Sequence, residues 1–237
     1  MNTSTYVYHV NDEEHYGFLA YENVIDTPRP AVLVAPDWSG SNDFSKSKAE
    51  QLAKLGYIAF VVDMYGLGRT GNTNEEKAAL MDPLINDRRL IRTRMRAAFD
   101  AVIGLEEVDF SRICAIGFCF GGLCALDLAR SGADLKGVVS FHGLLHKPDG
   151  LKNHAIVSKI LLLHGYDDPM VDVNQVQAFG AEMTDAYVDW QIHMYGGTMH
   201  AFTNPQANDP DFGTVYNPLA DKRSWASMTT FLQEVFY

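Results

Sequence analysis

The stretch that decides the fold is residues 112–129, RICAIGFCFGGLCALDLA. It begins as a short apolar run typical of a buried strand and ends as an apolar helix. The two meet at Gly117-x-Cys119-x-Gly121, the spacing of the strained strand-to-helix turn called a nucleophile elbow, with cysteine in the usual place of serine. The sequence therefore predicts a strand, a sharp turn and a helix, with Cys119 at the apex.

Comparable apolar runs alternate with helix-like segments along the whole chain. The expected strands are residues 6–10, 16–21, 31–35, 57–62, 112–117, 137–141, 160–164 and 188–195, and the expected helices are 46–54, 75–80, 83–105, 122–131, 173–184 and 221–234. Near-continuous hydrophobic strands separated by helices indicate a parallel sheet covered on both faces. We expect an α/β fold in one domain, residues 1–237, with an antiparallel N-terminal strand pair joined by residues 11–14.

The overall charge restricts the class of partner. The 237 residues carry a formal net charge of −11 at pH 7. An acidic protein is a poor partner for nucleic acid, whose phosphate backbone selects basic surfaces. The basic run at residues 88–96 lies in a helix-like stretch and is expected to be a solvated helix face. The composition favours small molecules over nucleic acid as partners.

Membrane-spanning segments, signal peptides and the arrangement of cysteines indicate the compartment of a protein. No apolar run approaches the roughly 20 residues that cross a bilayer, and the N-terminus lacks the basic and apolar regions of a signal peptide. The three cysteines are crowded into residues 114–124, which is no disulfide framework. We therefore expect a cytoplasmic protein with no membrane partner.

The cysteines are assigned by position. Cys119 would sit at the positive end of the following helix, a place that favours the thiolate form of a cysteine. Cys114 lies inside the predicted strand and Cys124 inside the predicted helix, where a free cysteine usually packs in the core. Cys119 is the candidate nucleophile, and an inert cysteine in a tight turn is the alternative.

A thiol nucleophile needs a base and a group that orients the base. In the nucleophile–acid–histidine order of this arrangement, Asp168 is preferred to Asp167 as the acid, because it precedes a proline that favours an extended backbone. His200, in a glycine-rich loop, is preferred to the mid-strand His193 as the base.

Two further histidines, His142 and His164, also end predicted strands, but they precede the candidate acid and are expected to pack or support the site. His142 and His146 lie four residues apart without a helix pattern or an evident third ligand, so no metal is expected. For the oxyanion, the backbone N–H of Phe120 is one expected donor, and that of Trp38, after the third strand, is the other.

Five segments together resemble the dienelactone hydrolase family. They are GFCFGG, HGYDDPMV and YGGTMHAF, in that order, with APDWSGSN after the third strand and DMYG after the fourth. The resemblance implies an α/β-hydrolase fold with a triad of Cys119, Asp168 and His200. It also implies cleavage of a cyclic or activated ester with no metal and no cofactor.

The sequence departs from that family at the substrate positions. Asp37 stands where dienelactone hydrolase has a glutamate thought to help activate the thiol, and Asn204 stands in place of an arginine. A second arginine is expected near residues 74–80, where only Lys77 is basic. Losing two bidentate clamps removes fixed-geometry recognition of a carboxylate.

Aromatic residues near the predicted site are candidates for the walls of the pocket. We expect aromatic walls from Trp38, Tyr65 and Phe202, suited to a neutral or less acidic substrate. Each of these aromatic residues, taken singly, is equally compatible with a place in the core.

Three hypotheses follow. The leading one is a hydrolase of a small lactone, carboxylic ester or thioester that forms an acyl-enzyme on Cys119. The second is a hydrolase-fold protein that binds a small molecule with little or no catalysis. The third is an oxidation-sensing thiol, with Cys114 or Cys124 as its resolving partner. The substrate and the oligomeric state stay open at this point.

Overall fold

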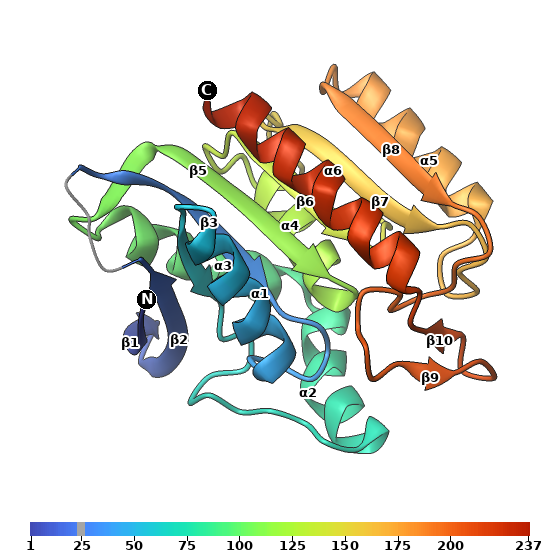
Figure 1. The fold of residues 1–237 in the computed structure, drawn as a ribbon, viewed down its shortest axis with the longest axis horizontal. Coiled ribbons are helices and arrows are strands. Elements are labelled where there is room, and N and C mark those ends of the chain that lie inside the picture. Colours follow the sequence, from blue (N-terminus) through green and yellow to red (C-terminus); the bar gives the residue numbers. More distant parts are fainter. Residues whose placement is uncertain (23–26) are drawn as a thin grey trace.

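The computed structural model describes residues 1–22 and 27–237, and Figure 1 shows a central twisted sheet between helices. The sheet has eight strands in the order β1-β2-β4-β3-β5-β6-β7-β8. Its strands are β1 (Asn2–Val10), β2 (Glu13–Tyr21), β3 (Arg29–Ala35), β4 (Ile58–Val61), β5 (Val108–Phe118), β6 (Gly137–Phe141), β7 (Lys159–Gly165) and β8 (Trp190–Tyr195). A small separate pair is formed by β9 (Asn208–Asp209) and β10 (Thr214–Val215).

The strand directions confirm the predicted α/β class. β1 pairs antiparallel with β2, and β2 pairs antiparallel with β4, whereas the strands from β4 through β8 are parallel neighbours. The N-terminal pair is longer than expected, running from Asn2 opposite Tyr21 to Val10 opposite Glu13. Its connection is therefore two residues, with Asn11 at a positive φ of 53° that asparagine tolerates.

Helices cover both faces of the sheet. They are α1 (Asp43–Lys54), α2 (Asn74–Asn86), α3 (Arg88–Ile103), α4 (Phe120–Arg130), α5 (Val173–Asp185) and α6 (Pro218–Phe236). The apolar residues of α3, α4 and α5 form one core with one face, and those of α1 and α6 form a second core with the other. Alternate residues of a strand pack into different cores: in β3, Leu33 belongs to the first core and Val32 to the second.

The predicted break at Pro83 is wrong. Pro83 lies inside α2, and the chain breaks instead at Asp87, whose side chain caps α3 by accepting a hydrogen bond from the Arg89 amide. A carboxylate at this position satisfies an N–H that the helix leaves unpaired. The local N-cap therefore decides the boundary.

The basic run is not simply a solvated face, which corrects a second expectation. Arg88 is only 7% exposed, and its Nε donates to Asp127 Oδ2 at 2.7 Å inside the core. Arg94 donates to the carbonyl oxygen of Met64 at 2.6 Å, while Arg96 remains half exposed beside Asp100. Because α3 packs on α4, the arginines of this one helix lie in two different environments, one buried and one exposed.

Parallel pairing places the carboxyl ends of the central strands together. Ala35 of β3 pairs with Gly117 of β5, Phe118 of β5 with Phe141 of β6, and Gly165 of β7 with Tyr195 of β8. The loops that follow these strands therefore meet at one edge of the sheet, as expected for an open α/β sheet.

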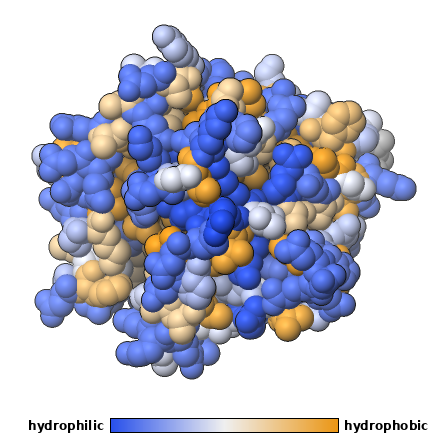
Figure 2. Space-filling model, turned by 180° about the vertical axis from the view of Figure 1, so that it is seen from behind, coloured by the Kyte–Doolittle hydropathy of each residue, from blue (hydrophilic) through white to orange (hydrophobic). Residues whose placement is uncertain are grey.

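On the side that Figure 2 shows, the distribution of hydrophobic atoms does not by itself mark a binding surface. Hydrophobic atoms there form small separate patches among hydrophilic ones. Such a mosaic is ordinary for a protein surface. Within residues 1–22 and 27–237, none of the helices combines the length and the apolar character that a bilayer crossing demands.

Candidate active site

The turn between β5 and α4 holds Cys119 in a strained backbone conformation. Its φ of 54° and ψ of −117° lie where side-chain-bearing residues are uncommon, and its amide donates to the carbonyl oxygen of Phe141 at 3.0 Å. A Cβ on Gly117 would collide with the carbonyl oxygen of Gly121, and a Cβ on Gly121 would collide with that of Ala35. Both glycines are therefore required for this close passage of strand and helix.

The three cysteines differ as expected. Cys114 and Cys124 are fully buried, and burial raises the pKa of both thiols well above the usual value. Cys119 is partly exposed and lines a cavity. The core packing predicted for Cys114 and Cys124 is confirmed.

The loop after β7 brings an acid to His200. Nδ1 of His200 lies 2.7 Å from Oδ2 of Asp168, and both side chains are buried. The second oxygen of Asp168 accepts hydrogen bonds from the amides of Met170 and Val171, which fixes the carboxylate. Nδ1 of His200 is therefore the donor to the carboxylate, and Nε2 is left for other chemistry.

The neighbouring Asp167 bonds the backbone and not the imidazole. Its amide donates to the carbonyl oxygen of Thr198, and its carboxylate accepts from the amide of Thr198 at 3.2 Å. It ties the loop after β7 to the loop that carries His200. The structure thus separates the two adjacent aspartates, one on the imidazole and one on the backbone.

His200 is also held by its own backbone. Its amide donates to the carbonyl oxygen of Gly213, and its carbonyl oxygen accepts from the amide of Val215. The short β9–β10 pair, visible below the lower end of α6 in Figure 1, therefore fixes the backbone of the histidine.

The charges around His200 favour its protonated form. Burial alone would lower the pKa of this imidazole, but electrostatic interaction with Cys119 and Asp168, together with hydrogen bonding to both side chains, raises its pKa to about 10. Among the described residues, Nε2 makes no hydrogen bond of good geometry, and Cys119 is the side chain that interacts with it. A proton held at Nε2 is therefore available on the cavity side of the ring.

His142 lies closer to the site than expected. Its ring packs edge-on against His200, with centroids 5.1 Å apart, and its Nε2 lies 2.8 Å from Oγ1 of Thr203. Burial and the neighbouring His200 lower the pKa of His142 well below the usual value, so it is neutral. It lines the cavity directly, whereas His164 bonds the carbonyl oxygen of Val171 behind the site.

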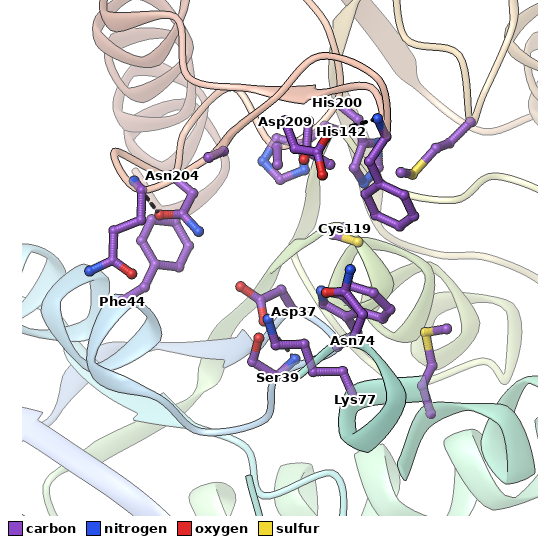
Figure 3. Close-up of a pocket in the computed structure, with 18 of the residues that line it drawn as sticks. Asp37, Ser39, Phe44, Asn74, Lys77, Cys119, His142, His200, Asn204 and Asp209 are labelled. Carbon is purple, nitrogen blue, oxygen red and sulfur yellow. Dashed lines mark hydrogen bonds between the residues drawn. The ribbon is translucent and has the colours of Figure 1, made fainter. Parts of the chain in front are cut away.

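The cavity over Cys119 has a volume of about 430 Å³. Figure 3 shows Cys119 between two groups of side chains, His142 and His200 on one side and Asp37, Asn74 and Lys77 on the other. The size is within the range of pockets that enclose small organic ligands.

The aromatic walls differ from the expected set. Trp38 lines the cavity and stacks on Phe212, with centroids 5.9 Å apart, and Phe44 forms another wall. Tyr65 and Phe202 are fully buried and do not line the cavity, so their prediction as wall residues is corrected. An aromatic residue after a strand can point inward as readily as outward, and sequence alone does not show which.

Tyr65 and Phe202 instead support the walls from behind. The Tyr65 hydroxyl donates to the carbonyl oxygen of Trp38 at 2.8 Å, and the ring stacks on Phe120. Phe202 packs edge-on against His142. Tyr65 thus positions the loop that carries Trp38, and Phe202 packs under the imidazole ring. Phe44 and Phe212 were missed, because one opens a helix and the other lies in the irregular β9–β10 segment.

The family-specific substrate positions line the same cavity. The Asp37 carboxylate accepts from the amide of Ser39 at 2.7 Å, and burial raises its pKa. Nζ of Lys77 lies 5.5 Å from the Trp38 ring centroid, and the Asn204 side chain accepts from the amide of Gln206. One lysine and several amides therefore line the cavity.

This fold and this edge of the sheet define an α/β hydrolase. The family model described as "Dienelactone hydrolase family" matches residues 17–236. The chain therefore belongs to the dienelactone hydrolase family and is a hydrolase acting on ester bonds.

Individual relatives agree over nearly full length. The structure is similar to one named m3DLH, with 37% identity over 100% of this chain and 99% of that one, and a TM-score of 0.94. It is equally similar, at 36% identity with the same coverage and TM-score, to a dienelactone hydrolase-like promiscuous phosphotriesterase, P91, from metagenomic libraries. A Bradyrhizobium protein named "Probable 2-oxo-3-(5-oxofuran-2-ylidene)propanoate lactonase" is 28% identical over 94% of this chain and 90% of its own.

Proposed function

We propose that the protein hydrolyses a small lactone, carboxylic ester or thioester through Cys119, His200 and Asp168, with a covalent acyl-enzyme. The observation that carries this proposal is the convergence of a strained Cys119 and a His200–Asp168 pair, 2.7 Å apart, on one cavity. A nucleophile, a base and an orienting carboxylate are the parts that covalent catalysis requires.

In the first half-reaction Cys119 and His200 start as a thiolate and an imidazolium. The raised pKa of His200 and the start of α4 at Phe120 both favour this charge state. Sγ attacks the carbonyl carbon, and the backbone N–H groups of Phe120 and Trp38 hold the oxyanion. Nε2 of His200 gives its proton to the leaving oxygen or sulfur, the ester bond breaks, and a thioester to Cys119 remains.

In the second half-reaction the neutral His200 takes a proton from water at Nε2. The hydroxide so formed attacks the acyl carbon, the bond to Sγ breaks, and the acid leaves. The enzyme returns to thiolate and imidazolium, so atoms and charges balance over the cycle. Asp168 holds Nδ1 and stabilises the imidazolium throughout.

The cavity supports a substrate that is not strongly acidic. It is lined by Lys77 and amide side chains, including Asn204, in place of two arginines. A single ammonium binds a carboxylate without the fixed two-point geometry of a guanidinium. The phosphotriesterase name of one relative and the lactonase name of another define the substrates to test first.

The test is an activity screen with two matched variants. Purified protein is incubated with activated esters, lactones, thioesters and a phosphotriester, with and without a free carboxylate. We expect turnover of the neutral esters, loss of turnover in Cys119→Ala, and partial activity at most in Cys119→Ser. Unchanged turnover in Cys119→Ala would end the proposal.

A labelling experiment separates this enzyme from a protein that only binds small molecules. Iodoacetamide is added near neutral pH in stoichiometric amount. We expect Cys119 to react faster than free cysteine, because a thiolate is the nucleophilic form. A rate no faster than that of free cysteine favours the binding protein.

A further inference from the structure

A second cavity lies beside the first. Its volume is about 740 Å³, and it is formed by the loop after β3, the start of α1, residues 68–72 and residues 204–206. The two cavities share five lining residues, namely Ser39, Phe44, Lys77, Asn204 and Gln206. The two cavities therefore adjoin each other at these five residues.

The second cavity is lined by groups that both donate and accept hydrogen bonds. The hydroxyl residues are Ser39, Ser41, Ser47 and Thr70, and the amide residues are Asn42, Asn72, Asn204 and Gln206. A hydroxyl or a carboxamide can serve each partner in either role. The partner that uses such a lining fully carries several hydroxyl groups of its own.

One of these groups lacks a partner. Ser41 is 7% exposed, and among the described residues its buried Oγ has no hydrogen bond. A buried hydroxyl without a partner costs about 1–3 kcal/mol, so such groups are usually satisfied by water or ligand. Ser41 therefore carries an unused hydrogen-bonding group in the wall of this cavity.

The charges at the cavity do not form an anion clamp. Nζ of Lys77 lies over the Trp38 ring and Nζ of Lys46 lies 5.9 Å from the Phe18 ring centroid. The Asp43 carboxylate adds a negative charge at the start of α1, where an anion would otherwise bind. The three charged residues that line the cavity, Lys46, Lys77 and Asp43, are outnumbered by its eight hydroxyl and amide residues, and this majority matches a neutral polar occupant.

We propose that this cavity, defined by the residues above, binds a neutral polyhydroxylated group of sugar size attached to the ester that Cys119 cleaves. The inference rests on the proposed function for its catalytic half. The Phe44 ring, shared by both cavities, supplies an apolar face for the carbon side of such a group, and the hydroxyls and amides supply its hydrogen bonds.

The first test compares esters that differ only in the group reaching the second cavity. Methyl 6-O-acetylglucoside is matched with butyl acetate, methyl gluconate with methyl hexanoate, and 5-acetoxypentanoate supplies a carboxylate. We expect one sugar-bearing ester to exceed its apolar match in kcat/KM by about tenfold or more, the effect of one or two added hydrogen bonds. Equal values for both pairs, or a preference for the carboxylate, would overturn the inference.

The second test uses Ser41→Ala and Gln206→Ala, with Ser111→Ala, on β5 outside both cavities, as the matched control. We expect the ratio of kcat/KM between the sugar-bearing and apolar esters to fall about five- to tenfold in the first two variants and to stay the same in the control. Ser41→Ala should not lower the melting temperature, because it removes an unpaired hydroxyl. Unchanged ratios in both cavity variants contradict the proposal.

A binding measurement keeps the inference separate from catalysis. Saturation-transfer NMR with methyl glucoside should show contact with wild-type protein and weaker contact with Ser41→Ala. If no ester is turned over but this contact is seen, the proposed catalysis fails and the binding site stands. If esters are turned over but methyl glucoside shows no contact, the binding site fails and the catalysis stands.

Discussion

Two buried groups of charged residues in this protein differ in how completely their hydrogen-bonding groups are paired. The first is the site pair His200 and Asp168, next to Cys119. The second, here called the α3–α5 network, consists of Arg88, Asp127, Arg130 and Glu182 and joins α3, α4 and α5.

In the α3–α5 network the guanidinium groups and carboxylates are matched to each other. Arg130 donates to both oxygens of Glu182, at 2.9 and 2.7 Å, to Asp127, and to the carbonyl oxygen of Leu145. Arg88 adds its 2.7 Å contact to Asp127 and one to a carbonyl oxygen. Because the charges neutralise one another, nothing remains for a ligand.

At the site, by contrast, part of the hydrogen-bonding capacity is left over. Nε2 of His200 and Nδ1 of His142 make no hydrogen bond of good geometry among the described residues, and both rings line the cavity. Buried polar groups are usually satisfied, so unpaired ones facing a cavity indicate where a substrate acts. The comparison teaches that burial and charge alone do not mark function, whereas unpaired groups on residues that line a cavity mark a candidate site.

The largest expected effect comes from removing the imidazole at the site. His200→Gln cannot hold or move the proton, so we expect kcat/KM for an activated ester to fall by about 10⁴-fold or more. The melting temperature should stay within a few degrees of wild type. Steady-state kinetics and thermal unfolding check both, and a loss under tenfold would place the base elsewhere.

The next largest effect should come from Asp168→Asn, for which we expect a drop of about 10³-fold and a changed pH profile. His200 has a folded-state pKa raised to about 10, so the imidazolium that protonates the leaving group is present below that pH and lost as pH rises through it. Removing the Asp168 charge lowers the pKa of His200, and the alkaline limb of kcat/KM should move about 1–3 units toward lower pH. An unshifted limb means that another group controls it.

The α3–α5 network should respond in stability and not in chemistry. Asp127→Ala leaves Arg88 and Arg130 buried with less compensation, and the free energy of unfolding should fall by about 3–5 kcal/mol. The matched control, Asp100→Ala, breaks the half-exposed pair with Arg96 and should cost about 0.3–0.5 kcal/mol. Urea unfolding gives both values. If Asp127→Ala kept its stability but lost activity per folded molecule, the division between the two groups would be wrong.

The sequence was informative where a local pattern has one structural solution. Gly117-x-Cys119-x-Gly121 requires two glycines because a Cβ at either position would collide with backbone, and the positions of the strands along the chain followed from the apolar runs. The carboxyl ends of parallel strands then brought Asp168 and His200 to the same edge.

Features that depend on packing between distant segments were out of reach. Arg88 is buried because α4 supplies Asp127, and Tyr65 is buried because it donates to the Trp38 loop. Phe212 belongs to the wall because the β9–β10 segment folds over the sheet edge. In each case the partner lies more than 25 residues away along the chain, and the local sequence around the residue does not predict that contact.

The central claim is that an acyl group passes through Cys119, and trapping that intermediate tests it most directly. The protein is mixed with excess p-nitrophenyl acetate, quenched in acid within milliseconds to seconds, and analysed by intact mass and peptide mapping. We expect one acetyl group per chain, on Cys119, that forms and decays at rates matching turnover and is more abundant in Asp168→Asn. Turnover with no adduct on Cys119, or with an adduct on another residue, would contradict it.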